Sequence, residues 1–107
     1  MAITRNELAE YQHWQPAEIK IIDDRAVRFS DVCAHEISMS DVEDPDLFVA
    51  EPIWKWQQTE AGKFIMEHAV KPPYWTRHLD HVTYGYKYRI MARLSEQHET
   101  FFRLKFK

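Results

Sequence analysis

The sequence predicts an α+β domain, with an antiparallel sheet of about four to six strands and one main helix packed on one face. Two observations predict this class. Residues 82–94 and 98–106 alternate apolar and polar side chains as strands do, whereas residues 52–70 carry apolar side chains at helical spacing. The 107 residues include four Trp, five Tyr and six Phe. This is enough for one core, so residues 1–107 are expected to form a single compact domain.

The first expected element is a short N-terminal helix over about residues 5–13. Thr4 is a suitable N-cap residue, and Glu7 stands three residues later, as in a capping box. Pro16 is expected to end the helix region, because the residue before a proline avoids helical geometry.

Three strands are expected next. Residues 19–21 and 27–29 are rich in β-branched and aromatic side chains and are separated by Asp23 and Asp24, which predicts two short strands joined by a turn. Residues 32–39 are expected to form a third strand, with one face made of Cys33, His35, Ile37 and Met39. Cys33 and His35 are interpreted as buried structural residues, with a metal or thiol role as the alternative.

The main helix is expected over about residues 52–70. Pro52 suits the first helical position, and two prolines after Lys71 end the helix. Gly62 weakens the pattern, and Thr59 could instead cap a second, separate helix. Trp54 and Trp56 lie about 200° apart around a helix, so both cannot pack on the same sheet. We therefore expect Trp54 to mark a partner surface.

The C-terminal hairpin is expected to pair residues 82–94 with residues 98–106, after a further strand at residues 74–79. The core-facing row is Val82, Tyr84, Tyr86, Tyr88, Ile90, Ala92 and Leu94. The outer face is basic and comprises Lys87, Arg89, Arg93, Arg103 and Lys105. Like charges that face each other across strands are unfavourable, so carboxylates from this chain or from a partner are expected near this face.

The charge is divided unevenly along the chain. Residues 1–62 contain thirteen Asp or Glu and five Lys or Arg, giving −8, whereas residues 63–107 contain four and nine, giving +5. Such asymmetry indicates either a nucleic-acid surface or an acidic half packed beside a basic sheet, and the second interpretation is preferred. The acidic residues 41–46 are expected to form a solvated loop, because no glycine provides the sharp turn of a calcium loop.

Several functional classes lack their motifs here. With only two glycines, the sequence contains neither a Walker loop nor a dinucleotide-binding fingerprint, since both motifs need glycines at fixed spacing. It also contains no nucleophile elbow and no zinc-binding cysteine pair. No cofactor is therefore expected. The single cysteine excludes an internal disulfide. The first residues contain no apolar run of the kind that forms a secretion signal or a membrane span. A soluble, cytoplasmic protein is expected.

Two short motifs resemble those of known families. His81-Val82-Thr83 and His98-Glu99-Thr100 are similar to the paired His-x-Thr motifs of 2H phosphoesterases, whose histidines act together as acid and base. On the predicted hairpin the two imidazoles lie about 40 Å apart, which prevents a shared site. Residues 85–88 resemble the RNP1 strand of RNA-recognition motifs, but no partner RNP2 strand is found and these tyrosines fit the core row.

The preferred function is a small, non-enzymatic protein-binding or assembly module, of the adaptor or inhibitor kind that viruses often encode. It is expected to bind a protein partner or a second copy through the basic hairpin face and Trp54. The first alternative is a nucleic-acid-binding domain that uses the same basic face. The second is a small metal-dependent enzyme on His68, His78 and His81, although a group of unrelated histidines is preferred over a metal site.

Overall fold

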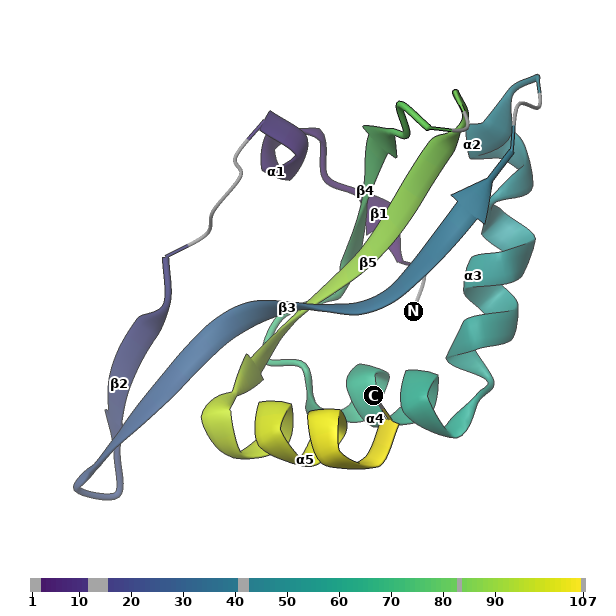
Figure 1. The fold of residues 1–107 in the computed structure, drawn as a ribbon. Coiled ribbons are helices and arrows are strands. Elements are labelled where there is room, and N and C mark those ends of the chain that lie inside the picture. Colours follow the sequence, from purple (N-terminus) through teal and green to yellow (C-terminus); the bar gives the residue numbers. More distant parts are fainter. Residues whose placement is uncertain (1–2, 12–15, 41–42, 83, 107) are drawn as a thin grey trace.

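The structure is a computed structural model that describes residues 3–11, 16–40, 43–82 and 84–106 (Figure 1). These ranges form a five-stranded sheet and five helical segments, which confirms the predicted α+β class. In chain order the elements are β1 (Thr4–Arg5), α1 (Glu7–Tyr11), β2 (Glu18–Ile22), β3 (Arg25–Met39), α2 (Pro45–Phe48), α3 (Ala50–Gln57), α4 (Glu60–His68), β4 (Tyr74–Leu79), β5 (Tyr86–Ser95) and α5 (Glu96–Phe106).

The sheet has the strand order β1-β4-β5-β3-β2. All neighbouring pairs are antiparallel except β1 and β4, which are parallel, so the sheet is mixed. The helices α3, α4 and α5 lie on one side of it (Figure 1). We call this side the helix face, and we call the opposite side, with Lys87, Arg89 and Arg93 of β5, the open face.

The core lies between the helix face and these three helices. Alternate residues of β5 are almost completely buried there: Tyr88, Ile90, Ala92 and Leu94. The helices contribute Val49, Ile53, Trp56, Ile65 and Phe102. Each large side chain buried in this way stabilises the fold by about 1.5–3 kcal/mol. The predicted inward row is therefore confirmed within β5, but Val82 and Tyr84 lie exposed in the loop before it.

The second half of the predicted C-terminal hairpin is wrong, because residues 96–106 form the helix α5. Ser95 Oγ accepts a hydrogen bond from the backbone N–H of His98 at 3.4 Å and caps the first turn. Phe102 and Phe106, one turn apart, contact Phe64 of α4. Apolar residues at this spacing fit a helix and a strand equally well, and the helix places both rings against the core. The strands beside β5 are β3 and β4 instead.

The main helical region is confirmed, but it is divided into α3 and α4 at Gln58 and Thr59. Thr59 is the N-cap of α4, and its Oγ1 accepts a hydrogen bond from Gly62 N at 3.1 Å. The sequence alternative of a second helix that begins after Thr59 is therefore the correct one. Gly62 is needed at this corner, because a Cβ there would lie 2.0 Å from the carbonyl oxygen of Trp56.

The predicted N-terminal helix begins later than expected, and Thr4 does not cap it. Thr4 belongs to β1, while Asn6 Oδ1 accepts a hydrogen bond from Ala9 N at 3.2 Å at the start of α1. Thr4 and Arg5 pair in parallel with Tyr74 and Trp75 of β4, so these two residues form a strand instead of the start of the helix. The predicted end of the helix, residues 12–13, lies outside the described residues.

The predicted turn between two strands is confirmed, since Asp23 and Asp24 join β2 to β3 with positive φ angles of 50° and 62°. The separate strand expected at residues 32–39 is the continuation of the 15-residue β3. A β-bulge between Cys33 and His35 shifts its register, so Cys33 pairs with Met91 and His35 pairs with Ile90. The prediction that Cys33 and His35 share a face is therefore wrong.

Within the described ranges, every helix is too short or too polar to traverse a lipid bilayer.

Candidate functional site

The basic residues of β5 face carboxylates on the neighbouring strand. Arg89 Nε lies 3.3 Å from Glu36 Oε2, and Lys87 Nζ lies 3.7 Å from Glu36 Oε1. Lys87 also lies 4.0 Å from Asp80. Because β3 pairs with β5 in register, it places Glu36 directly beside Arg89. The predicted anionic groups therefore come from this chain, and the acidic half of the sequence neutralises part of the basic half.

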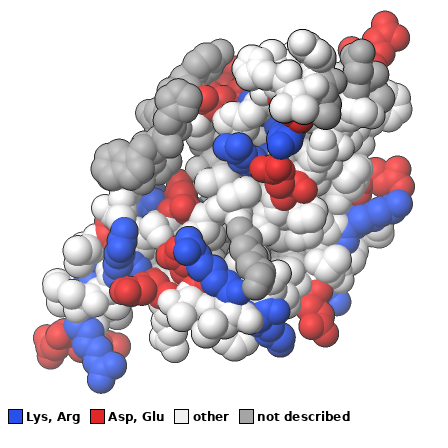
Figure 2. All heavy atoms as spheres, viewed as in Figure 1, with Lys and Arg blue, Asp and Glu red and all other residues white. Residues whose placement is uncertain are grey.

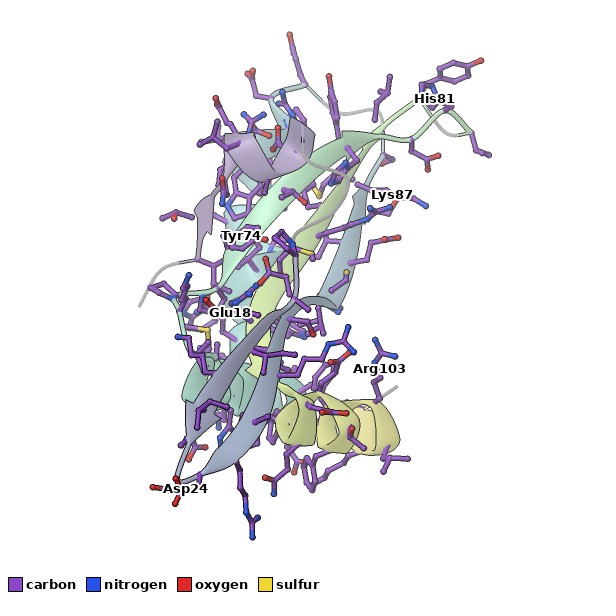
Figure 3. The ribbon with its side chains drawn as sticks, turned by 90° about the vertical axis from the view of Figure 1, so that its left-hand side faces the viewer. Glu18, Asp24, Tyr74, His81, Lys87 and Arg103 are labelled. Atoms are coloured by element: carbon purple, nitrogen blue, oxygen red, sulfur yellow. The ribbon has the colours of Figure 1, made fainter. Side chains whose placement is uncertain are left out.

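Arg93 is held most firmly of the three open-face cations. Its Nη1 lies 2.8 Å from Asp31 Oδ1, and the two side chains are only 12% and 11% exposed. Asp31 also accepts a hydrogen bond from the Tyr74 hydroxyl at 2.9 Å, and Glu18 lies 3.7 Å from Arg93. Burial, and then the hydrogen bond to Asp31, raise the pKa of Tyr74 above its ordinary value. Figure 3 shows Tyr74 and Glu18 close together on the open face.

The other two predicted basic residues are not part of the open face. Arg103 and Lys105 lie on α5, where Arg103 forms an ion pair with Glu99 at 2.8 Å. Lys105 Nζ lies over the ring of Phe101 at 5.7 Å. Figure 2 accordingly shows Lys and Arg groups interspersed with Asp and Glu groups on the face in view. The structure does not bring the five predicted cations into one continuous basic surface.

The two neighbouring tryptophans of α3 point in opposite directions, as their spacing predicts. Trp56 is 6% exposed and stacks on His35 of β3, with ring centroids 5.4 Å apart. Trp54 is 61% exposed. The corner between α3 and α4 at Gly62 fixes the rotation of α3, because it seats α4 against the backbone of Trp56.

Trp54 lies at the rim of a groove of about 530 Å³ between α3 and the strand edge near β1. Most of the lining is apolar: Ile3, Val49, Ala50, Ile53, Trp54 and Trp75, with Asp46, Gln57 and Gln58 as the polar members. The floor residues Val49 and Ile53 are buried, so the groove opens onto the core. We call it the Trp54 groove. Its size and lining suit an apolar side chain of a bound peptide.

An ionic cluster at one end fixes the groove in place. Asp46 of α2 lies 3.0 Å from Arg77 of β4 and 3.5 Å from Arg5 of β1, and it accepts a hydrogen bond from the Tyr88 hydroxyl. Glu10 of α1 binds Arg5 at 2.9 Å and also accepts the backbone N–H of Arg77 at 2.8 Å. Burial, and then Asp46, raise the pKa of Tyr88. The cluster joins two helices, α1 and α2, to three strands, β1, β4 and β5, and Asp46 places it at the groove.

The sequence did not reveal this cluster. The acidic residues 41–46 were expected to form a solvated loop, yet Asp46 belongs to α2 and pairs with Arg77 and Arg5, and residues 41–42 lie outside the described ranges. Only the alternation of Trp75, Arg77 and Leu79 on one side of β4, which the structure confirms, could have placed Arg77 on the helix face.

The three histidines considered as metal ligands lie on three different parts of the fold. His78 Nε2 lies 2.9 Å from Thr76 Oγ1 on β4, and His81 lies in the loop between β4 and β5, away from α4 (Figures 1 and 3). His68 of α4 instead meets His98 of α5, with ring centroids 4.2 Å apart. Burial, and then the charge of His68, lower the pKa of His98. Among the described residues, no three His, Cys, Asp or Glu side chains are grouped so that they could hold a metal ion.

The separation of His81 from His98 is also visible. His81 lies at one end of the molecule, and α5, which carries Arg103 and His98, lies at the other (Figure 3). The resemblance to 2H phosphoesterases therefore has no shared site to support it. No family model, curated protein or solved structure matches this chain.

Proposed function

We propose that this chain is a small, non-enzymatic protein-binding module that acts in the cytoplasm and holds an apolar side chain of its partner in the Trp54 groove. The observation that carries the proposal is the exposure of Trp54, 61%, at the rim of an apolar groove. Tryptophan is among the residues most enriched at binding hot spots, where it excludes water from a central contact. The single free cysteine suits a reducing compartment.

The setting of Trp54 supports a binding role over a purely structural one. Its neighbour Trp56 already fills the core position on α3, so Trp54 adds little to the packing of the sheet. The Asp46 cluster holds the groove walls in position before any partner arrives. A rigid site loses less conformational entropy on binding than one that must be ordered first.

The basic open face supports a binding role less well. Lys87, Arg89 and Arg93 each lie within 4.0 Å of a carboxylate of this chain. A nucleic acid would have to displace these carboxylates, and affinity based on phosphate contacts requires free cations. The nucleic-acid alternative remains testable by measuring DNA and RNA binding at about 50 mM salt, where phosphate contacts are strong. The metal-enzyme alternative is testable by elemental analysis of the purified protein.

The proposed function can be tested with a displayed library of random peptides. The library is selected on the wild-type protein, and each enriched peptide is then measured against Trp54→Ala and against Leu104→Ala. Leu104 is an exposed apolar residue of α5, outside the groove, and serves as the matched control. We expect peptides with an apolar anchor residue, and a loss of affinity of at least about tenfold for Trp54→Ala alone.

Both variants replace exposed side chains, so thermal melting should show that each remains folded. The proposal fails if no peptide is enriched, or if the enriched peptides bind Trp54→Ala as tightly as the wild type.

A further inference from the structure

The two edges of the sheet differ in how far they are protected. The β1 edge consists of only two residues, and the next helix, α1, supplies Glu10 to the backbone N–H of Arg77. Very short edge strands and covering helices are devices that prevent pairing with another chain. The β2 edge has five residues, and no described strand lies on its outer side.

The β2 edge also projects from the body of the protein. Residues 25–28 of β3 pair with β2 beyond the end of β5, because Phe29 is the last residue of β3 that pairs with β5. The resulting two-stranded ribbon extends away from the helices (Figure 1). Two-stranded ribbons are only marginally stable by themselves in water. A further strand at this edge would stabilise the ribbon.

Three of the five residues of β2 are exposed isoleucines. Ile19 is 68% exposed and Ile21 is 72% exposed, and Ile22 is exposed as well. The strand contains no proline, and its pairing with β3 runs without a bulge from Glu18 to Ile22. Lysine is the charged residue that most often protects an edge strand, and Lys20 is the one lysine of β2. Glu18 lies 3.7 Å from it and forms an ion pair with it. This edge therefore lacks the usual features that prevent strand addition.

We propose that β2 pairs with β2 of a second copy of this chain, antiparallel and centred on Ile19. The twofold axis is perpendicular to the sheet, so the two sheets become continuous across the dimer. In this register Ile19 faces Ile19 of the second copy. Glu18 of each copy faces Lys20 of the other, which gives two cross-strand ion pairs.

The backbone geometry of the β2–β3 turn fits this pairing. The turn contains two residues, so its closing pair, Ile22 and Arg25, exchanges both backbone hydrogen bonds. Hydrogen-bonded residues alternate along an antiparallel strand. The N–H and C=O groups of Ile19 and Ile21 therefore point away from β3, toward the position of a second copy.

Charge complementarity selects the register. Antiparallel partners point to the same side of a sheet, so the centre of symmetry must fall on a residue. Centring on Lys20 places it opposite Lys20 of the second copy, and centring on Ile21 places Glu18 opposite Asp24. Both arrangements oppose like charges, which is unfavourable. Centring on Ile22 would place Lys20 opposite Asp24, but Asp23 and Asp24 form the turn, with positive φ angles, and do not continue the strand. Among the registers that pair residues of β2 with each other, only centring on Ile19 pairs opposite charges.

The test begins with the oligomeric state of the full chain, measured by sedimentation velocity over a range of concentrations. We expect a concentration-dependent dimer for the wild type. Ile19→Arg opposes two cations at the centre and should give a monomer, whereas Leu8→Arg, a control at an exposed leucine of α1, should still dimerise. Circular dichroism checks that both variants are folded.

Charge reversal tests the register. Lys20→Glu alone and Glu18→Lys alone each replace two attractive pairs by two repulsive ones, so each should weaken the dimer by roughly tenfold or more. Mixing the two variants should restore it, because every charge then faces its opposite. Glu18 also lies near Arg93, but a variant that had unfolded for that reason could not give a restored dimer in the mixture.

The proposal is overturned if the wild type is monomeric up to about 100 µM, which is the range of weak dimers. It is also overturned if Ile19→Arg dimerises like the wild type, or if the mixture of charge variants stays monomeric. The Trp54 groove lies on other elements, so its peptide binding should persist in Ile19→Arg, and failure of one proposal leaves the other intact.

Discussion

Replacing Gly62 by alanine should destabilise the protein even though alanine favours helices. A Cβ at this position would lie 2.0 Å from Trp56 O and 2.8 Å from the Cα of Gln57, whereas ordinary contact begins at 3.4 Å. Overpacking of a core costs about 1–3 kcal/mol, and the upper value applies here because the obstructing atoms are backbone. The gain in helix propensity returns about 1 kcal/mol. We therefore expect a net loss of about 2 kcal/mol in the free energy of unfolding.

Urea denaturation measures this change, and a fall in melting temperature of roughly 10 °C should accompany it. The control is Lys63→Ala at the next position, which is exposed and should change stability by less than about 0.5 kcal/mol. If Gly62→Ala is as stable as the wild type, the close approach of α4 to α3 is incorrect. The placement of Trp54 that depends on this approach would then be incorrect as well.

Three further outcomes are expected. Arg93→Ala should cost about 2–3 kcal/mol in urea denaturation, because it leaves Asp31 nearly buried without its cation, and a loss below about 1 kcal/mol would contradict this. Arg89→Glu combined with Arg103→Glu should remain folded, with a loss of roughly 1 kcal/mol, since both ion pairs are exposed; unfolding would contradict this. The folded state lowers the pKa of His98 below the 6.5 of the unfolded chain, so the free energy of unfolding should decrease as pH falls below about 6.5. His98→Gln should make this dependence weaker, and an unchanged pH profile would count against it.

The sheet was predictable from the sequence where one side of a strand is buried. The period of two in residues 86–94 reports that burial directly, and Tyr88, Ile90, Ala92 and Leu94 are buried as the pattern predicts. In residues 74–79 the strand is confirmed, but its burial does not alternate, since Thr76 is buried and Leu79 is exposed. The break between α3 and α4 was visible as the alternative cap at Thr59. The pattern failed at residues 98–106, because aromatic residues four apart suit both periods and only tertiary packing on Phe64 decides between them.

Other features depend on contacts between distant segments, which no local pattern encodes. The bulge at residues 33–35 reverses the side on which Cys33 lies, and it has no clear local sequence mark. The parallel pairing of β1 joins residues about 70 positions apart. For the candidate site, the spacing of Trp54 and Trp56 predicted one exposed indole, but the groove beside Trp54 is formed by segments that only the fold brings together.

The parallel pairing of β1 links order in residues 3–6 to occupancy of the Trp54 groove. Ile3 lines the groove, and the backbone of its segment is attached to the sheet through a two-residue ladder and the hydrogen bond from Asn6 N to Trp75 O at 2.9 Å. Short attachments of this kind open more often than central strands, so the Asn6 amide should exchange with solvent faster than those of β5. A peptide that contacts Ile3 would slow this exchange. The coupling is reciprocal. If the peptide stabilises the attachment of this segment by a given factor, detaching the segment lowers the affinity for the peptide by the same factor.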